Sequence, residues 1–349
     1  MRYVPVVHLQ EQMILGQDIY DASGRMLLAK RTALTAENIS YIAFLGVPGI
    51  YIDDEFSADI QVKEVLRPEI KQTALSLVKN VFLSDEDNRV TDEEKEIMES
   101  VSNVVDDIIN EEQVMTNLIN VKTYDDYTYF HSVNVAVLGG ILAAKCHLPR
   151  TAVEEVVTAG FLHDIGKVAI DINLLNAPRQ LTEAERMRMM DHPRIGYETL
   201  INRFNFNDNV NLAVYQHHEW YNGGGYPCHI DNRRTTIAGR ILKCADVYDA
   251  MTSKRIYHNP YLPSEVMEYI MGRSGMEFDP FVVQIMATDF CVYPNGCEVE
   301  LSDGRKAIVV ENHKGFVLRP TVRIIETGEV LDLIDDANNR MITIVKVNL

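Results

Sequence analysis

Two stretches of sequence decide the kind of fold that this chain adopts: AGFLHDIGK at residues 159–167 and HHEWYNGGGYP at residues 217–227. Both place histidines among apolar residues, where a buried polar group without a partner costs about 1–3 kcal/mol. A metal ion is a partner that satisfies several imidazoles at once. A ligand set of His and Asp without Cys suits Fe, Mn, Zn or Co, and carboxylate-bridged dinuclear sites in particular. The two stretches therefore predict a metal centre.

The sequence around both stretches is helical. Residues 122–290 are rich in helical patterns, with one Gly-rich interruption at 222–227. Residues 59–121 read as a helical connector, in which Pro68 suits the first turn of a helix and Thr91-x-x-Glu94 has the form of a capping box. The apolar residues after this capping box recur at helical spacing and predict one buried helix face: Ile97, Val101, Val104, Val105, Ile108, Met115 and Leu118.

The two ends of the chain carry strand patterns. Residues 1–58 read as a small α+β domain, with a turn at Asp21–Gly24 and a short helix capped by Thr35. Residues 291–349 read as a small β domain, in which Asp303-Gly304 and Lys314-Gly315 are hairpin turns by type. The strands expected in this last part are Val299–Leu301, Ala307–Val310, Phe316–Leu318, Val322–Ile325 and Met341–Val347. The chain is thus predicted to be a mainly α domain flanked by two small domains.

The amino-acid composition narrows the range of functions that the chain can have. The 349 residues include 33 basic and 51 acidic ones, for a net charge of −18. Such a charge argues against binding to nucleic acid or to an anionic membrane, because both need a basic surface. The five cysteines form no C-x-x-C motif, and no run of about 18 apolar residues could span a membrane. These features predict a cytoplasmic protein.

Six segments in order resemble the HD-GYP family of cyclic dinucleotide phosphodiesterases, a branch of the HD metal-dependent phosphohydrolases. HDIGK and HHEWYNGGGYP carry the likeness first. The other four segments are YTYFHS at 127–132, DHPRIG at 191–196, ADVYDAMTS at 245–253 and FDP at 278–280. The resemblance covers residues 122–290 and implies that this region is a catalytic domain, an HD-type helical bundle. It also implies hydrolysis of cyclic di-GMP to linear pGpG, with GMP as the product of a second cleavage.

The resemblance implies a set of metal ligands for two divalent ions, Fe or Mn. Asp164 would bridge the two ions. One ion would be completed by His131, His163 and Asp246, and the other by His192, His217 and His218. Two ions about 3.5–4 Å apart activate water and clamp a phosphate oxygen. Lys167, one helical turn after His163, can neutralise the charge that develops on the phosphate or the leaving oxygen. Asp164 and Lys167 are the predicted catalytic residues.

The substrate-binding residues are predicted on the same basis. They are Lys167, Gly225, Tyr226, Pro227, Arg255 and His258. Glycines let the backbone approach a ligand closely, and Tyr226 offers an aromatic face. The planar fork of Arg255 suits guanine O6 and N7. His258 stands where the family often has a second basic residue, and it is one of the departures that keep the alternative functions below open.

The chain departs from the family pattern at a few positions, and these keep other functions open. Asn222 replaces a usual aspartate, Thr236 ends a stretch without the usual Gly and Pro, and Tyr127 replaces a glutamate that supports a third metal in some members. We therefore expect a dinuclear site. The alternatives are a weakly active binding or scaffold module, and a phosphodiesterase for another cyclic dinucleotide such as cyclic GMP-AMP. The loop Gly223–Pro227, called the GYP loop below, and the flanking domains are candidate contacts for protein partners, and the oligomeric state is left open.

Overall fold

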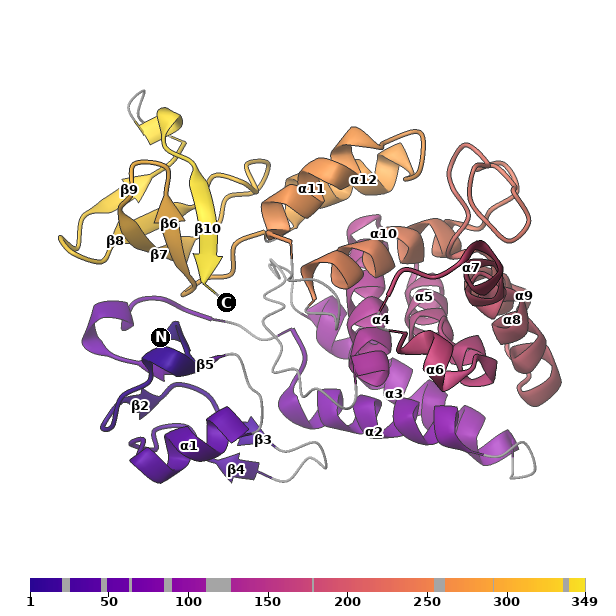
Figure 1. Cartoon of the computed structure of the whole chain (residues 1–349), viewed down its shortest axis with the longest axis horizontal. Helices are drawn as coiled ribbons and strands as arrows, with labels where there is room; N and C mark the ends of the chain where they lie inside the picture. Colours follow the sequence, from indigo (N-terminus) through magenta and orange to yellow (C-terminus); the bar gives the residue numbers. More distant parts are fainter. Residues whose placement is uncertain are drawn as a thin grey trace. The chain divides into compact units, whose positions relative to one another are not determined.

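The computed structural model describes residues 1–20, 26–44, 49–62, 65–84, 90–110, 127–177, 179–253, 261–290, 292–334 and 339–348. The chain divides into two compact units, and Figure 1 labels most of their helices and strands. The helical unit comprises Leu66–Glu112 and Thr128–Met286, and the β-rich unit comprises Met1–Val65, Gln113–Tyr127 and Ala287–Leu349.

The helical unit consists of α-helices and one short 3-10 segment. Its elements are α2 (Pro68–Leu83), α3 (Val90–Asn110), α4 (Tyr127–Lys145), α5 (Arg150–Leu162), η4 (Ile165–Ala169), α6 (Ile172–Leu175), α7 (Glu183–Met189), α8 (His192–Arg203), α9 (Asp208–Gln216), α10 (Ile237–Thr252), α11 (Pro263–Gly272) and α12 (Pro280–Asp289). The last residues of α12 belong to the β-rich unit.

Helix α4 forms the centre of this unit. Every residue from His131 to Ala143 is buried, as expected of a helix that is covered on all sides. Ile108 of α3, Val156 of α5 and Leu242 of α10 all approach its paired glycines. Helix α5 in turn packs against α3, α9 and α10. Residues of α3, α5 and α10 thus meet at the paired glycines of the buried helix α4.

The sequence accounts for the start of α2 and for the buried face of α3, but not for the start of α3. The prediction of a helix from Pro68 is confirmed by α2, and α3 buries the predicted stripe from Ile97 to Ile108. Helix α3 begins at Val90, one residue before Thr91, so Thr91 lies inside the helix rather than at its N-cap. Met115 and Leu118 lie outside the described residues.

The β-rich unit contains short antiparallel strands. Its elements are β1 (Arg2–Pro5), η1 (Val6–His8), β2 (Ile14–Leu15), β3 (Ile19–Tyr20), β4 (Met26–Leu28), α1 (Ala36–Phe44), β5 (Gly49–Asp53), η2 (Glu55–Ser57), β6 (Glu298–Leu301), β7 (Lys306–Glu311), β8 (Thr321–Ile324), β9 (Val330–Asp332), η5 (Asn339–Met341) and β10 (Ile344–Asn348). The strand orders are β1-β5-β2, β3-β4 and β10-β6-β7-β8-β9.

The N-terminal and C-terminal parts of this unit share one core. Tyr3, Tyr51, Ile60 and Val62 pack with Ile308 of the five-stranded sheet. The backbone N–H of Tyr3 also donates to the carbonyl of Gly296 at 2.8 Å. Strands far apart in the sequence are therefore held together by both apolar packing and hydrogen bonds.

The strand prediction for the C-terminal part needs two corrections: one strand predicted within the described residues is absent, and one observed strand was not predicted. The prediction of a strand at Phe316–Leu318 is wrong, because these residues form turns, and the Arg319 N–H donates to the Phe316 carbonyl at 2.8 Å. Strand β9 was not predicted, since its three residues carry little strand signal, and it pairs at the edge with β8. The predicted turn at Asp21–Gly24 lies outside the described residues.

The predicted fold class is confirmed: a mainly helical domain, with a small α+β part before it and a small antiparallel sheet after it. In the described part of the chain, none of the helices combines the length and the apolar character needed to cross a bilayer.

Candidate metal centre

Three histidines of the helical unit are oriented in the same way, by a hydrogen bond to a nearby backbone carbonyl. Each ring Nδ1 lies beside the backbone carbonyl three residues earlier: His163 with Gly160 at 2.8 Å, His192 with Met189 at 2.8 Å and His217 with Val214 at 2.6 Å. These carbonyls belong to the last turns of α5, α7 and α9, where they lack partners within the helix. The network therefore assigns a proton to each Nδ1 and a lone pair to each Nε2.

His131 is oriented differently because it lies inside α4. The carbonyls that precede it serve the hydrogen bonds of the helix itself. Its Nδ1 instead lies 2.7 Å from Oδ2 of Asp249, a buried carboxylate on α10. Its Nε2 faces Oδ1 of Asp246 at 3.1 Å and Oδ2 of Asp164 at 3.7 Å.

The predicted ligands gather in two groups whose donor atoms lie within 4.8 Å of one another. The groups are His131, His163 and Asp164, and His192, His217 and His218. Asp164 lies beside both: its Oδ2 is 3.4 Å from His163 Nε2, and its Oδ1 is 3.5 Å from His192 Nε2. Asp246 lies beside His131, and its Oδ2 is 3.8 Å from His218 Nδ1. All seven predicted ligands are therefore brought together.

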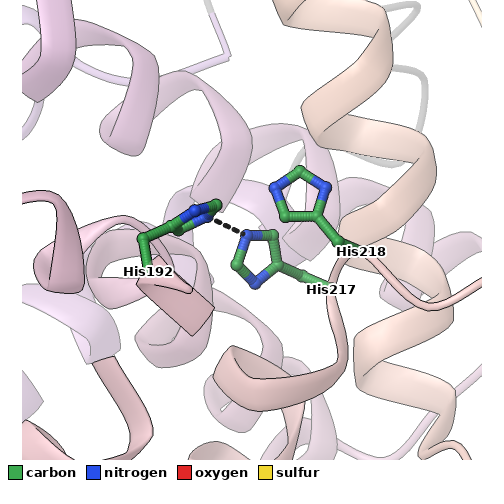
Figure 2. A group of neighbouring side chains, drawn as sticks. All are labelled: His192, His217 and His218. Atoms are coloured by element: carbon green, nitrogen blue, oxygen red, sulfur yellow. Dashed lines mark hydrogen bonds between the residues drawn. The ribbon is translucent and has the colours of Figure 1, made fainter. Parts of the chain in front are cut away.

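Two of the ligand nitrogens point at each other rather than at a hydrogen-bond donor. His192 Nε2 and His217 Nε2 lie 3.2 Å apart, and the dashed line in Figure 2 marks this contact. A hydrogen bond there would need a second proton on one ring. Burial, followed by the charge of Lys167, lowers the pKa of His192 to about 4. Burial and the neighbouring histidines hold the pKa of His217 well below its usual value. At neutral pH two lone pairs therefore face each other.

Two further atoms of the cluster lack a hydrogen bond. Within the described residues, His163 Nε2 and Asp164 Oδ1 are buried and have no hydrogen-bond partner. An unpartnered buried acceptor is costly, and a metal cation is the partner that several such acceptors can share. The donor set of this chain therefore fits metal ions.

The carboxylates of the cluster are ionised at neutral pH. Burial opposes ionisation of Asp164, but the interactions with the neighbouring His163 and Lys167 outweigh it and hold the pKa of that carboxyl well below its usual value. Burial lowers the pKa of His131, but the hydrogen bonds and charges of Asp246 and Asp249 outweigh it, and the pKa is raised to about 9. A metal ion that binds at His131 must therefore displace a proton.

Lys167 lies at the edge of this cluster. It is part of η4, and its Nζ is 2.6 Å from Asp164 Oδ2. The backbone of η4 also lies close to α8, because a Cβ at Gly166 would fall 2.1 Å from the His192 carbonyl oxygen. Only glycine allows this approach, which places Asp164 and His192 side by side.

The GYP loop folds back over His218. The Tyr226 ring stacks on the His218 ring, with centroids 4.6 Å apart and 19° between the planes. The Tyr226 N–H donates to the His218 carbonyl, and a Cβ at Gly225 would fall 2.4 Å from the same oxygen. Gly225 is buried, while Tyr226 and Pro227 are partly exposed. Arg255 and His258 lie outside the described residues.

Sequence reasoning missed two buried carboxylates beside the cluster. Glu219 accepts hydrogen bonds from the N–H groups of Cys228 at 2.6 Å and Ile230 at 3.2 Å, which fixes the end of the loop. Asp249 contacts His131, as described above. Its position three residues after Asp246, on the same face of a helix, is a signal that could have identified it.

The departures from the family pattern have local roles. Asn222 Oδ1 accepts from the Gly224 N–H at 3.0 Å, which stabilises the turn of the loop. Thr236 is the N-cap of α10 and accepts from the Gly239 N–H at 3.0 Å. Tyr127 is the first residue of α4. The prediction of a dinuclear site rests on its side chain, which lies outside the described residues.

The helical fold and the buried His–Asp groups define an HD-type metal-binding domain. Residues 83–282, more than half of the chain, match the HD domain family. The chain therefore belongs to the HD domain family. Together with its named relatives, this match confirms the HD-GYP prediction.

Several curated proteins are similar to this chain. It is 34% identical over 227 residues to the cyclic di-GMP phosphodiesterase PA4108 of Pseudomonas aeruginosa, covering 64% of this chain and 55% of that protein. It is 31% identical over 218 residues to the cyclic di-GMP phosphodiesterase response regulator RpfG of Xanthomonas campestris pv. campestris, covering 62% and 53%. The chain thus spans about half the length of these relatives.

A third relative and one solved structure complete the comparison. The chain is 31% identical over 191 residues to the 3'3'-cGAMP-specific phosphodiesterase 2 of Vibrio cholerae, covering 54% of this chain and 36% of that protein. The structure of Bd1817, an HDG"Y"P protein from Bdellovibrio bacteriovorus, has a TM-score of 0.56 and 16% identity, and covers 81% of this chain and 97% of that chain. This last likeness shows the shared fold.

Proposed function

We propose that this chain is a metal-dependent phosphodiesterase that hydrolyses a 3′–5′ phosphodiester bond of cyclic di-GMP to give linear pGpG. The observation that carries the proposal is the pair of buried histidine groups beside Asp164, whose lone pairs face one another. The names of the two cyclic di-GMP phosphodiesterases described above support the choice of substrate.

The site would hold two divalent ions, Fe or Mn. We assign one to His131, His163 and Asp246, the other to His192, His217 and His218, and Asp164 to both. When bound, such a pair of ions supplies an activated water and charge stabilisation for the phosphate. The hydrolysis adds water across the P–O3′ bond, so phosphorus gains an oxygen and the 3′ oxygen gains a proton.

The exposed edge of the cluster indicates where the substrate would approach. His131, His163, Asp164, His192 and His217 are all at most 2% exposed. The side chains of His218 and Lys167 are 17% and 24% exposed. A phosphate that arrives on this side meets the Lys167 ammonium, which can neutralise charge on the leaving oxygen. The partly exposed Tyr226 ring beside His218 offers a face on which a base can stack.

A product assay tests this proposal. The protein is purified without oxygen, loaded with Fe(II) or Mn(II) and incubated with cyclic di-GMP, and the nucleotides are separated by chromatography. We expect pGpG to form, to disappear on chelation, and to be absent with the His163→Ala/Asp164→Ala variant. A later GMP peak would reveal a second cleavage. Unchanged cyclic di-GMP with both metal sites filled would contradict the proposal.

A second candidate substrate is cyclic GMP-AMP, because one relative is named as specific for it. Equimolar cyclic di-GMP and cyclic GMP-AMP in one reaction distinguish the two: the substrate consumed first has the larger kcat/KM. Tight binding of either ligand without turnover would instead favour a binding or scaffold module. A cytoplasmic location, and protein partners that bind the GYP loop or the flanking domains, also remain proposals.

A further inference from the structure

The two histidine groups differ because one of them contains His131, whose Nδ1 has a different partner from that of His163, His192 and His217. Behind His163, His192 and His217 there is a neutral backbone carbonyl at a helix end. Behind His131 there is a carboxylate, Asp249, at 2.7 Å. A carboxylate that accepts the Nδ1 proton makes the opposite nitrogen a stronger donor to a metal than a carbonyl does. Of these four rings, His131 is the one whose Nδ1 faces an anion.

Asp249 is itself held in place. It is only 4% exposed. Its Oδ1 accepts from Asn134 Nδ2 at 2.9 Å, and its Oδ2 accepts from Ser253 Oγ at 3.3 Å as well as from His131. Asn134 follows His131 by three residues on α4, so the carboxylate connects α4 to α10 at the level of the cluster. Such a network leaves the His131 ring little freedom to rotate.

The same group also carries more negative charge. Asp246 Oδ1 lies 3.1 Å from His131 Nε2, whereas its other oxygen lies 3.8 Å from His218 Nδ1. The group around His131 therefore has Asp246 beside its Nε2, in addition to the shared Asp164. The group around His192 consists of three imidazoles and has no carboxylate among its three members. A divalent cation is attracted more strongly to the group with the larger negative charge.

From this geometry we propose that the two metal positions are unequal, and that Asp249 is the positioning residue that makes the His131 position the tighter one. The inference rests on the metal site of the proposed function but not on its substrate. It concerns the order and strength of metal binding, which can be measured whether or not cyclic di-GMP is hydrolysed.

The test is a titration of the full, metal-free chain with Mn(II), in which free Mn(II) is counted by electron paramagnetic resonance. For the unaltered protein we expect two steps whose dissociation constants differ at least tenfold. Asp249→Asn should weaken the tighter step about 10–100-fold and leave the weaker step unchanged. Asp279→Asn is the matched control, because Asp279 is similarly buried and pairs with Arg240 at 2.7 Å. It should leave both steps unchanged.

A double-mutant cycle assigns the effect to His131. In a His131→Ala background, Asp249→Asn should have no further effect on Mn(II) binding, because the ring through which it acts is gone. If Asp249→Asn does not fold, Ser253→Ala, which removes one hydrogen bond to the carboxylate, should weaken the tighter step by a few-fold. Equal affinity of both positions in the unaltered protein would overturn the proposal. So would equal weakening of both steps by Asp249→Asn, or an additive effect in the His131→Ala background.

Discussion

The helical unit and the β-rich unit bury very different kinds of side chain. Among the described residues, the buried histidines, carboxylates and lysine all lie in the helical unit. The described core of the β-rich unit consists mainly of apolar and tyrosine side chains, such as Tyr3, Ile52 and Ile308. Buried charge reduces stability unless something satisfies it. The difference teaches that the β-rich core is complete in itself, whereas the helical unit contains a polar cluster that a metal would complete.

The largest effect is expected at the carboxylate beside both histidine groups. Asp164→Asn removes the negative charge next to His163, His192 and Lys167, and we expect product formation to fall by about 10³-fold or more. Such a fall corresponds to about 4 kcal/mol in the activation barrier. The measurement is the rate of pGpG formation under saturating Mn(II). Asp59→Asn is the matched control in the β-rich unit, and a similar loss there would break the comparison.

A cavity in the β-rich core should affect stability but not chemistry. Ile308 is 1% exposed and packs against Tyr3 and Tyr51. Ile308→Ala should destabilise the β-rich unit by about 2–5 kcal/mol. We expect faster hydrogen exchange in β6 and β7, with an unchanged rate of hydrolysis by the folded protein.

The corresponding cavity in the helical unit completes this experiment. Leu138 of α4 is fully buried, and Leu138→Ala should lower the urea midpoint recorded by Trp220, the single tryptophan of the chain. If Ile308→Ala also abolished hydrolysis under native conditions, the two units would not be independent in the way that their cores suggest.

Acid should destabilise the metal-free helical unit. The pKa of His192 is about 4 in the folded chain, below its usual value of 6.5. As pH falls from 6.5 to 4, the unfolded chain therefore takes up a proton that the folded chain does not, and stability is lost. For this one buried group the loss is about 3 kcal/mol. Burial lowers the pKa of His217 in the same direction.

This pH dependence is measured by urea unfolding of the metal-free protein between pH 7 and pH 4, followed by Trp220 fluorescence. His192→Gln does not titrate in this range and should flatten the profile. The His131 contribution has the opposite sign: its pKa of about 9 adds stability below pH 6.5 that is lost as pH rises towards 9. A profile that is flat from pH 6.5 to 4 would show that the histidines are not buried as described.

Much of the helical unit could be read from the sequence because its signals are local. Pro68 marks the start of α2, and the stripe of Val101 and Ile108 marks the buried face of α3. The gathering of His131 with His163 required the family pattern, because residues on α4 and at the end of α5 meet only through tertiary packing. Their roles as ligands remain a prediction that metal binding must test.

The parts that could not be predicted depend on long-range contacts. The packing of Ile308 against Tyr3 joins residues at opposite ends of the chain, and no local pattern encodes such a pair. Strand β9 is three residues long and takes its shape from pairing with β8. Asp249 was overlooked because its role depends on where the His131 ring points, which the sequence does not state.

The smallest effect is expected at an exposed ion pair of the β-rich unit. Arg323 donates to Asp59 Oδ1 at 2.9 Å and to the Phe56 carbonyl at 2.7 Å. The Arg323 hydrogen bond lowers the pKa of Asp59 to about 2. Because the folded value lies below the usual one, the pair adds stability above pH 4 that is lost as pH falls towards 2. The Asp59 side chain is 61% exposed, so solvent screening limits the contribution to about 0.5 kcal/mol.

Hydrogen exchange of β8 in the unaltered protein and in Asp59→Asn measures this contribution. The difference should be small at pH 6, smaller in 0.5 M salt, and absent near pH 2. Arg323 keeps its bond to the Phe56 carbonyl in the variant, so the register of β8 should not change. A loss of several kcal/mol would contradict the comparison, because the β-rich unit would then also depend on a charged pair. A small loss would sharpen it, since it would leave apolar packing as the main source of stability in that unit.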